Sequence, residues 1–157
     1  SSDLHGFRDG LIAADSALRA GVSREELTQE FAGMGRVRNS RIVRAVIHHA
    51  SELSRSPYES FARALIIEAD FPWPIFFKAQ FKALPGITTA LCINNAYLVD
   101  IVSAKALPHQ RERHQLLRKA GFTVLCYSPR QLVDHPDRFL SDLTATVSAG
   151  QKAARSA

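Results

Sequence analysis

Apolar residues recur at helical spacing through the first third of the chain. Helices are predicted over residues 9–20, 23–33 and from Asn39 or Ser40 to 50. The first ends before Gly21, a typical residue just past a helix C-terminus. Ser23 and Glu26 have the spacing of a capping box, in which each of the two side chains accepts a hydrogen bond from the backbone amide of the other residue. The pattern indicates a small helical region.

The pattern changes from residue 56 onward. A helix over 57–69 precedes three strand-like runs at 75–82, 87–93 and 96–102, joined by a Pro85-Gly86 turn and an Asn94-Asn95 turn. Such short connections predict an antiparallel meander. A helix over 108–120 then leads to an apolar strand over 122–127, which can join the sheet in parallel. Ser128-Pro129 and His135-Pro136 begin two last helices.

This order of elements predicts an α+β fold: a mixed sheet of about four strands flanked by helices, preceded by a small helical region. The expected domains are a helical region at 1–55, an α/β domain at 56–147 and a flexible tail at 148–157.

The composition is that of a folded protein, with 46% hydrophobic and 22% charged residues. No apolar run approaches the roughly 20 residues that span a bilayer. The first residues lack the character of a signal peptide, and the two cysteines favour buried thiols, so a cytoplasmic protein is expected. Since Met34 is the only methionine, the chain is interpreted as part of a longer protein.

Several motifs carry a family resemblance. They are Ser56-Pro-x-Glu59-Ser with Arg63, then Pro72-x-Pro74 and Gln80, and then Arg111-x-Arg113 with Leu117-x-x-x-Gly121. Their order resembles the very-short-patch-repair-like endonuclease domain of the PD-(D/E)XK superfamily, which has a restriction-endonuclease-like sheet. The upstream Ala13-Ala-Asp-x-Ala-Leu18 resembles the region before this domain in actinobacterial regulators of the AbiEi antitoxin type.

The resemblance implies a metal site built from a helix Glu, a second-strand Asp and an acidic tripeptide on the third strand. Glu59 matches the first position and Asp100 matches the tripeptide acid, so these two are the candidate catalytic and metal-binding residues. Thr89 stands at the second-strand position and Val102 at the second polar member of the tripeptide. Since Mg²⁺ needs oxygen ligands, the motif is degenerate, and Lys105 is a weak catalytic candidate.

Each acid also has a structural interpretation. Glu59 can cap its own helix with Ser56, or pair with Arg63 one turn later. Asp100 lies in an apolar strand, where a buried carboxylate needs a partner such as Lys105 or Arg63, unless it lies at a cleft.

Two basic helix faces are candidate phosphate-binding surfaces, and solvated faces are the alternative interpretation for both. The candidate nucleic-acid-binding residues are Arg41, Arg44, Arg111, Arg113, His114, Arg118 and Lys119.

The sequence therefore predicts a non-cleaving, nuclease-like domain that acts as a nucleic-acid-binding or regulatory module of a larger protein. The alternatives are an active Mg²⁺-dependent DNA endonuclease and an antitoxin-like protein-interaction domain. DNA or a protein such as a toxin is the expected partner, without a membrane, and a cofactor, Mg²⁺, is expected only for the active enzyme.

Overall fold

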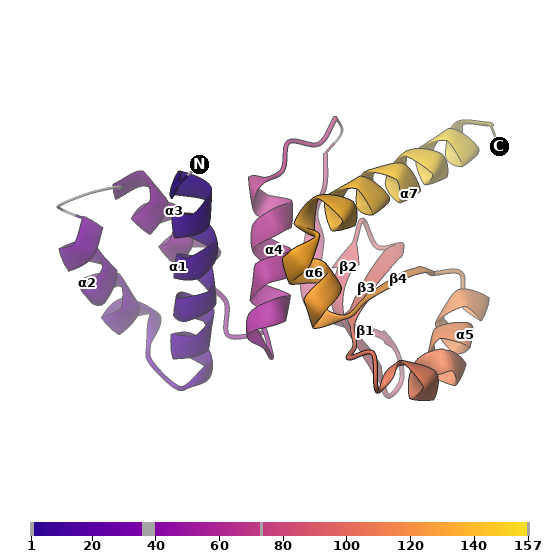
Figure 1. Cartoon of the computed structure of the whole chain (residues 1–157), viewed down its shortest axis with the longest axis horizontal. Helices are drawn as coiled ribbons and strands as arrows, with labels where there is room; N and C mark the ends of the chain where they lie inside the picture. Colours follow the sequence, from indigo (N-terminus) through magenta and orange to yellow (C-terminus); the bar gives the residue numbers. More distant parts are fainter. Residues whose placement is uncertain (1, 36–39, 73, 157) are drawn as a thin grey trace. The chain divides into compact units, whose positions relative to one another are not determined.

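The computed structural model describes residues 2–35, 40–72 and 74–156 (Figure 1). By its contacts the chain divides into two compact units, Ser1–Glu68 and Ala69–Ala157. The predicted domain boundary between residues 55 and 56 falls before helix α4, whereas the division by contacts falls after it.

The N-terminal unit is helical. Its helices are α1 (Ser2–Arg19), α2 (Arg24–Gly35), α3 (Ser40–His49) and α4 (Pro57–Glu68). The predicted alternative start of the third helix, Asn39, lies outside the described residues. The Ser23 hydroxyl accepts from the Glu26 amide at 3.1 Å, which is one of the two bonds of the predicted capping box.

Apolar side chains from all four helices form the core of this unit; the buried ones are Phe7, Leu11, Ala14, Leu27, Val46, Ala50 and Ala64. Gly10 lets α1 approach α3 closely, because a Cβ there would lie 2.9 Å from a Val46 methyl.

The C-terminal unit contains one mixed sheet of four strands in the order β1-β2-β3-β4. The strands are β1 (Phe77–Leu84), β2 (Ile87–Ile93), β3 (Tyr97–Ile101) and β4 (Thr123–Tyr127). The first three pair antiparallel, and β4 joins β3 in parallel through the 3-10 turn η1 (Leu107–Gln110) and helix α5 (Arg111–Lys119). The predicted meander and parallel crossover are thereby confirmed.

Helices cover both faces of this sheet. Leu117 of α5 packs on a cluster with Cys92, Leu98 and Val124. The opposite face meets α7 (Pro136–Ser156), where the rings of Tyr127 and Phe139 lie edge to face at 5.2 Å. The short helix α6 (Pro129–Asp134) leads into α7 and begins with a complete capping box at Ser128. Figure 1 shows α5 apart from α6 and α7 around the sheet.

Helix α7 extends over residues that the sequence assigns to a flexible tail. It continues to Ser156, because alanine, glutamine and lysine after residue 150 are good helix formers. Gly150 also lets α7 pack closely against β3, since a Cβ there would lie 1.8 Å from the Tyr97 hydroxyl oxygen.

The protein is an α+β protein with a helical N-terminal region and a four-stranded mixed sheet, as predicted. In the part of the chain that the structure describes, none of the helices is both long enough and apolar enough to cross a membrane.

Candidate functional site around Asp100

Asp100 occupies the fourth position of β3 and is 4% exposed. Side chains alternate along a strand, so Asp100 lies on the same face as Leu98, the face that α5 covers. Cys126 is its register partner on β4 and lies on that face too. The acid is therefore held between the sheet and α5.

Two residues of α5 bind the Asp100 carboxylate. Its Oδ2 accepts a hydrogen bond from Nη1 of Arg113 and lies 2.9 Å from Nε2 of His114. Arg113 also donates through Nη2 to the carbonyl of Thr88, near the start of β2. The guanidinium thus links α5 to two strands, and His114 is itself buried at 5% exposure. Asp100 therefore forms an ion pair within the fold, which is one of the two interpretations of this acid; the other is a position at a cleft.

The partners of Asp100 differ from those named from the sequence. Lys105 is exposed in the turn after β3, and Arg63 belongs to the N-terminal unit, where it binds another acid. Arg113 follows Asp100 by 13 residues, and the parallel crossover returns α5 over the strand that carries the acid. Because the crossover brings Arg113 over Asp100, the arginine and not Lys105 is the partner of this acid.

Cys126 lies in the same electrostatic environment. Burial and, secondarily, the Asp100 charge raise the pKa of its thiol, while Arg113 and Arg118 act in the opposite direction. Since the thiolate is the nucleophilic form, this shift favours the less reactive, protonated thiol.

The residues at the implied metal site do not fit Mg²⁺. Asp100 Oδ2 already faces a guanidinium and an imidazole, and Mg²⁺ prefers several hard oxygen ligands in an octahedron. Thr89 is fully buried, and its hydroxyl donates to the Leu91 carbonyl at 3.2 Å. Among the described residues, no three His, Cys, Asp or Glu side chains are grouped so that they could hold a metal ion.

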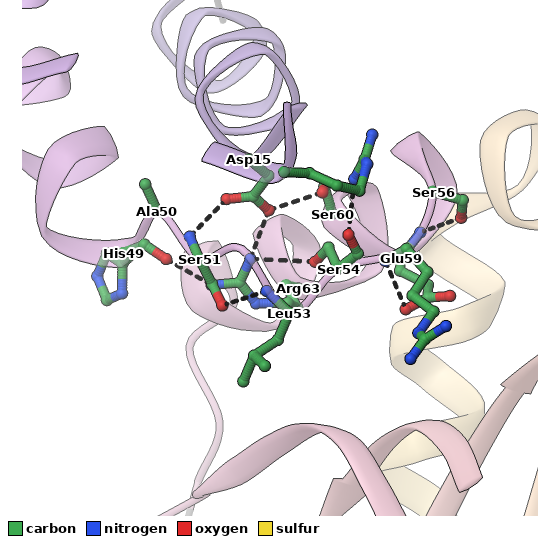
Figure 2. A network of polar contacts seen from close by, with 12 residues as sticks. Asp15, His49, Ala50, Ser51, Leu53, Ser54, Ser56, Glu59, Ser60 and Arg63 are labelled. Atoms are coloured by element: carbon green, nitrogen blue, oxygen red, sulfur yellow. Dashed lines mark hydrogen bonds and ion pairs between the residues drawn. The ribbon is translucent and has the colours of Figure 1, made fainter. Parts of the chain in front are cut away.

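Glu59, the other candidate acid, caps the start of α4 (Figure 2). Its amide donates to the Ser56 hydroxyl at 3.3 Å, and its Oε1 accepts from the Arg55 amide at 3.2 Å. The sequence predicts the Ser56 amide as the donor to the Glu59 carboxylate, whereas the donor is the amide of the preceding residue, Arg55. Glu59 and Asp100 thus each have partners within their own unit.

A second polar cluster, which we call the Asp15 network, lies in the N-terminal unit (Figure 2). Asp15 on α1 is fully buried, and its Oδ2 accepts from Ser60 Oγ and Arg63 Nη1, both at 2.6 Å. Its Oδ1 accepts from the Ser51 amide at 2.8 Å. The carboxylate therefore joins α1, the segment after α3, and α4.

Arg63 completes the Asp15 network. It donates through Nη2 to the His49 carbonyl and, at 3.4 Å, through Nη1 to Ser54 Oγ. Burial lowers the pKa of the Arg63 guanidinium, and the Asp15 charge and hydrogen bond oppose that shift. A buried cation and a buried anion are tolerated here because each satisfies the other.

No buried polar contact is predicted for Asp15 in the sequence analysis. A signal was available, because Asp15 follows Leu11 by four residues and precedes Leu18 by three, so it lies on the apolar face of α1. An acid on such a face needs a partner from elsewhere in the chain.

The predicted nucleic-acid-binding residues separate into two groups. Arg113 and His114 are committed to Asp100. The others are exposed, with Arg111, Arg118 and Lys119 on α5 and Arg41 and Arg44 on α3. Because α3 and α5 belong to different units, they are two separate candidate surfaces.

Comparisons of this chain with protein-family models, with curated proteins and with solved structures found no match.

Proposed function

We propose that the C-terminal unit is a nuclease-like domain that does not cleave, and that it binds nucleic acid as a module of a larger protein. The observation that supports this most is the pairing of Asp100 with Arg113 and His114. A metal-dependent nuclease needs this carboxylate for its metal, whereas here the carboxylate holds a helix against the sheet.

The distribution of charge favours nucleic acid as the partner. Residues 69–157 contain eleven lysine and arginine residues and six acids, so they carry the whole net charge of +5. Residues 1–68 contain nine of each. A basic unit with exposed arginines on one helix attracts phosphates.

Helix α5 is the proposed contact surface. Arg111 and Arg118 are seven residues apart on the helix, so they lie on one side, and both are exposed. Lys119 is exposed beside them. His114, which the spacing predicts on the same face as these arginines, is buried together with Leu117. The buried side therefore adjoins the arginines, which stay exposed at its margin.

The test measures binding of a short DNA duplex by fluorescence anisotropy at several salt concentrations. If both arginines contact phosphates, the double substitution R111A/R118A lowers the slope of log K against log salt by about 0.9 for each contact. Arg130→Ala is the matched control, because Arg130 is exposed and lies on α6. Equal loss in the control variant, or no binding by the wild-type chain, contradicts nucleic-acid binding through α5 and favours a protein partner.

Cleavage is tested separately with supercoiled plasmid in Mg²⁺ or Mn²⁺. The expected result is no nicking above background by the wild-type chain. Nicking that Asp100→Asn abolishes would establish the active endonuclease instead, since this substitution keeps the shape of the side chain and removes its charge.

A further inference from the structure

A pocket of about 300 Å³ lies beside β4. Its lining includes the four successive residues Val124–Tyr127. Successive side chains of a strand point to opposite faces of the sheet, so four in a row border one pocket only where the pocket runs along the edge of the strand. Strand β4 is the last strand of the sheet, and this edge is its unpaired one.

The backbone of β4 offers hydrogen-bonding groups to this pocket. The Thr123 amide donates to the Ala96 carbonyl, and the Tyr127 carbonyl accepts from the Val102 amide, so both residues turn their backbone groups toward β3. In a parallel pair every second residue does so. The amides and carbonyls of Val124 and Cys126 therefore point to the free edge.

The two edges of the sheet differ in their protection. On β1, exposed Lys78 and Lys82 and a positive φ of 48° at Gln80 interrupt the edge, which is how proteins discourage further strand pairing. Strand β4 contains no charged residue and no proline, and its register with β3 is regular throughout. The β4 edge is thus left open to an added strand.

The wall opposite β4 comes from α6 and α7. It includes Gln131, His135, Arg138 and Asp142. Asp142 accepts the Tyr127 hydroxyl hydrogen bond at 2.8 Å. Arg138 is exposed, and within the described part of the chain it takes part in none of the salt bridges. Its positive charge acts on the Tyr127 hydroxyl in the same pocket, so the guanidinium can also meet an incoming acid there.

We propose that the free edge of β4 binds an extended peptide segment that carries an acidic side chain. The peptide backbone pairs with Val124 and Cys126, and its carboxylate binds Arg138 in the adjoining pocket, as in other cases of strand addition. A second copy of this chain fits less well, because two units of charge +5 would meet. This site is distinct from the exposed side of α5 and goes beyond the proposed function.

The experiment selects peptides from a phage-displayed library of random short sequences against the full chain. Enriched peptides are expected to combine strand-forming residues with Asp or Glu. Arg138→Glu is expected to weaken their binding by about tenfold or more, as the loss of one interfacial charge pair does. Arg130→Glu is the matched control, since it makes the same charge change outside the pocket and leaves affinity within about twofold.

Amide hydrogen exchange measured by NMR locates the bound peptide. Binding is expected to slow exchange of the Val124 and Cys126 amides, while the Leu125 amide, which already faces β3, changes little. The proposal is overturned if no peptide is enriched, if Arg138→Glu binds as well as the wild type, or if these two amides are unaffected. If exchange of these two amides is already slow without peptide and the protein has twice the mass of one chain, a second copy occupies the edge. That result also overturns the proposal.

Discussion

Replacing Arg63 with methionine is expected to destabilise the N-terminal unit strongly. Methionine keeps much of the length of the side chain but removes the guanidinium. It leaves Asp15 fully buried without its cation and removes the donor to the His49 carbonyl. Breaking a buried pair by deleting one partner costs about 3–5 kcal/mol.

The same geometry predicts a smaller loss when both partners are removed. In Asp15→Leu with Arg63→Met no buried charge remains, so the double variant is expected to be more stable than Arg63→Met alone. An exposed pair provides the control: Arg130 and Asp134 are 91% and 52% exposed, and Arg130→Met is expected to cost below about 0.5 kcal/mol.

Hydrogen exchange followed by mass spectrometry suits this test, because it reports stability segment by segment. Arg63→Met is expected to accelerate exchange in α1 and α4 by the factor that corresponds to the lost free energy. Urea unfolding followed by circular dichroism gives the overall loss. A loss below about 1 kcal/mol for Arg63→Met, or a double variant less stable than the single one, would refute the argument that the pair is a desolvated, mutually dependent contact.

Three further predictions concern the C-terminal unit. Gly150→Ala is expected to lower stability by about 1–3 kcal/mol in thermal unfolding, because its Cβ would meet the Tyr97 hydroxyl, whereas Ala149→Ser at an exposed position is expected to have little effect. Burial and the Asp142 hydrogen bond raise the pKa of Tyr127, so the unfolded chain loses this proton at a lower pH than the folded chain. The free energy of unfolding is therefore expected to fall as the pH rises above about 10. Tyr127→Phe is expected to flatten that fall, and a variant with the same pH profile as the wild type would contradict the prediction. Burial raises the pKa of both cysteine thiols, so a thiol reagent at neutral pH is expected to label the native chain more slowly than the urea-unfolded chain, and equal rates would contradict this.

The elements that the sequence predicts correctly depend on local chemistry. The first strand follows from alternation and the last from an apolar run, and the turns at Gly86 and at Asn94 and Asn95, which all have positive φ, separate the first three strands. The helix starts at Ser23 and Ser128 follow from caps that span three residues. Each of these interactions is decided within one short segment, so its residues are visible together in the sequence.

The partners of the buried acids are not decided locally. Asp15 and Arg63 lie 48 residues apart, and Asp100 meets Arg113 only after the crossover helix has returned to the sheet. Spacing along the chain favours Lys105 for Asp100, since that lysine is near in sequence. The packing of α5 by Leu117 and the second bond of Arg113 to Thr88 decide otherwise.

The stretch from Ser56 to Arg63 therefore has a physical role that does not require catalysis. Ser56 and Glu59 begin α4, while Ser60 and Arg63 bind Asp15 on α1. Asp15 belongs to the upstream segment that carries part of the family resemblance, so two separate pieces of that resemblance meet in one buried network. A buried acid and arginine constrain each other's presence, because either one alone is costly. The residues that carry this resemblance therefore stabilise the packing of α1 against α4, a role that is independent of any chemistry at the sheet.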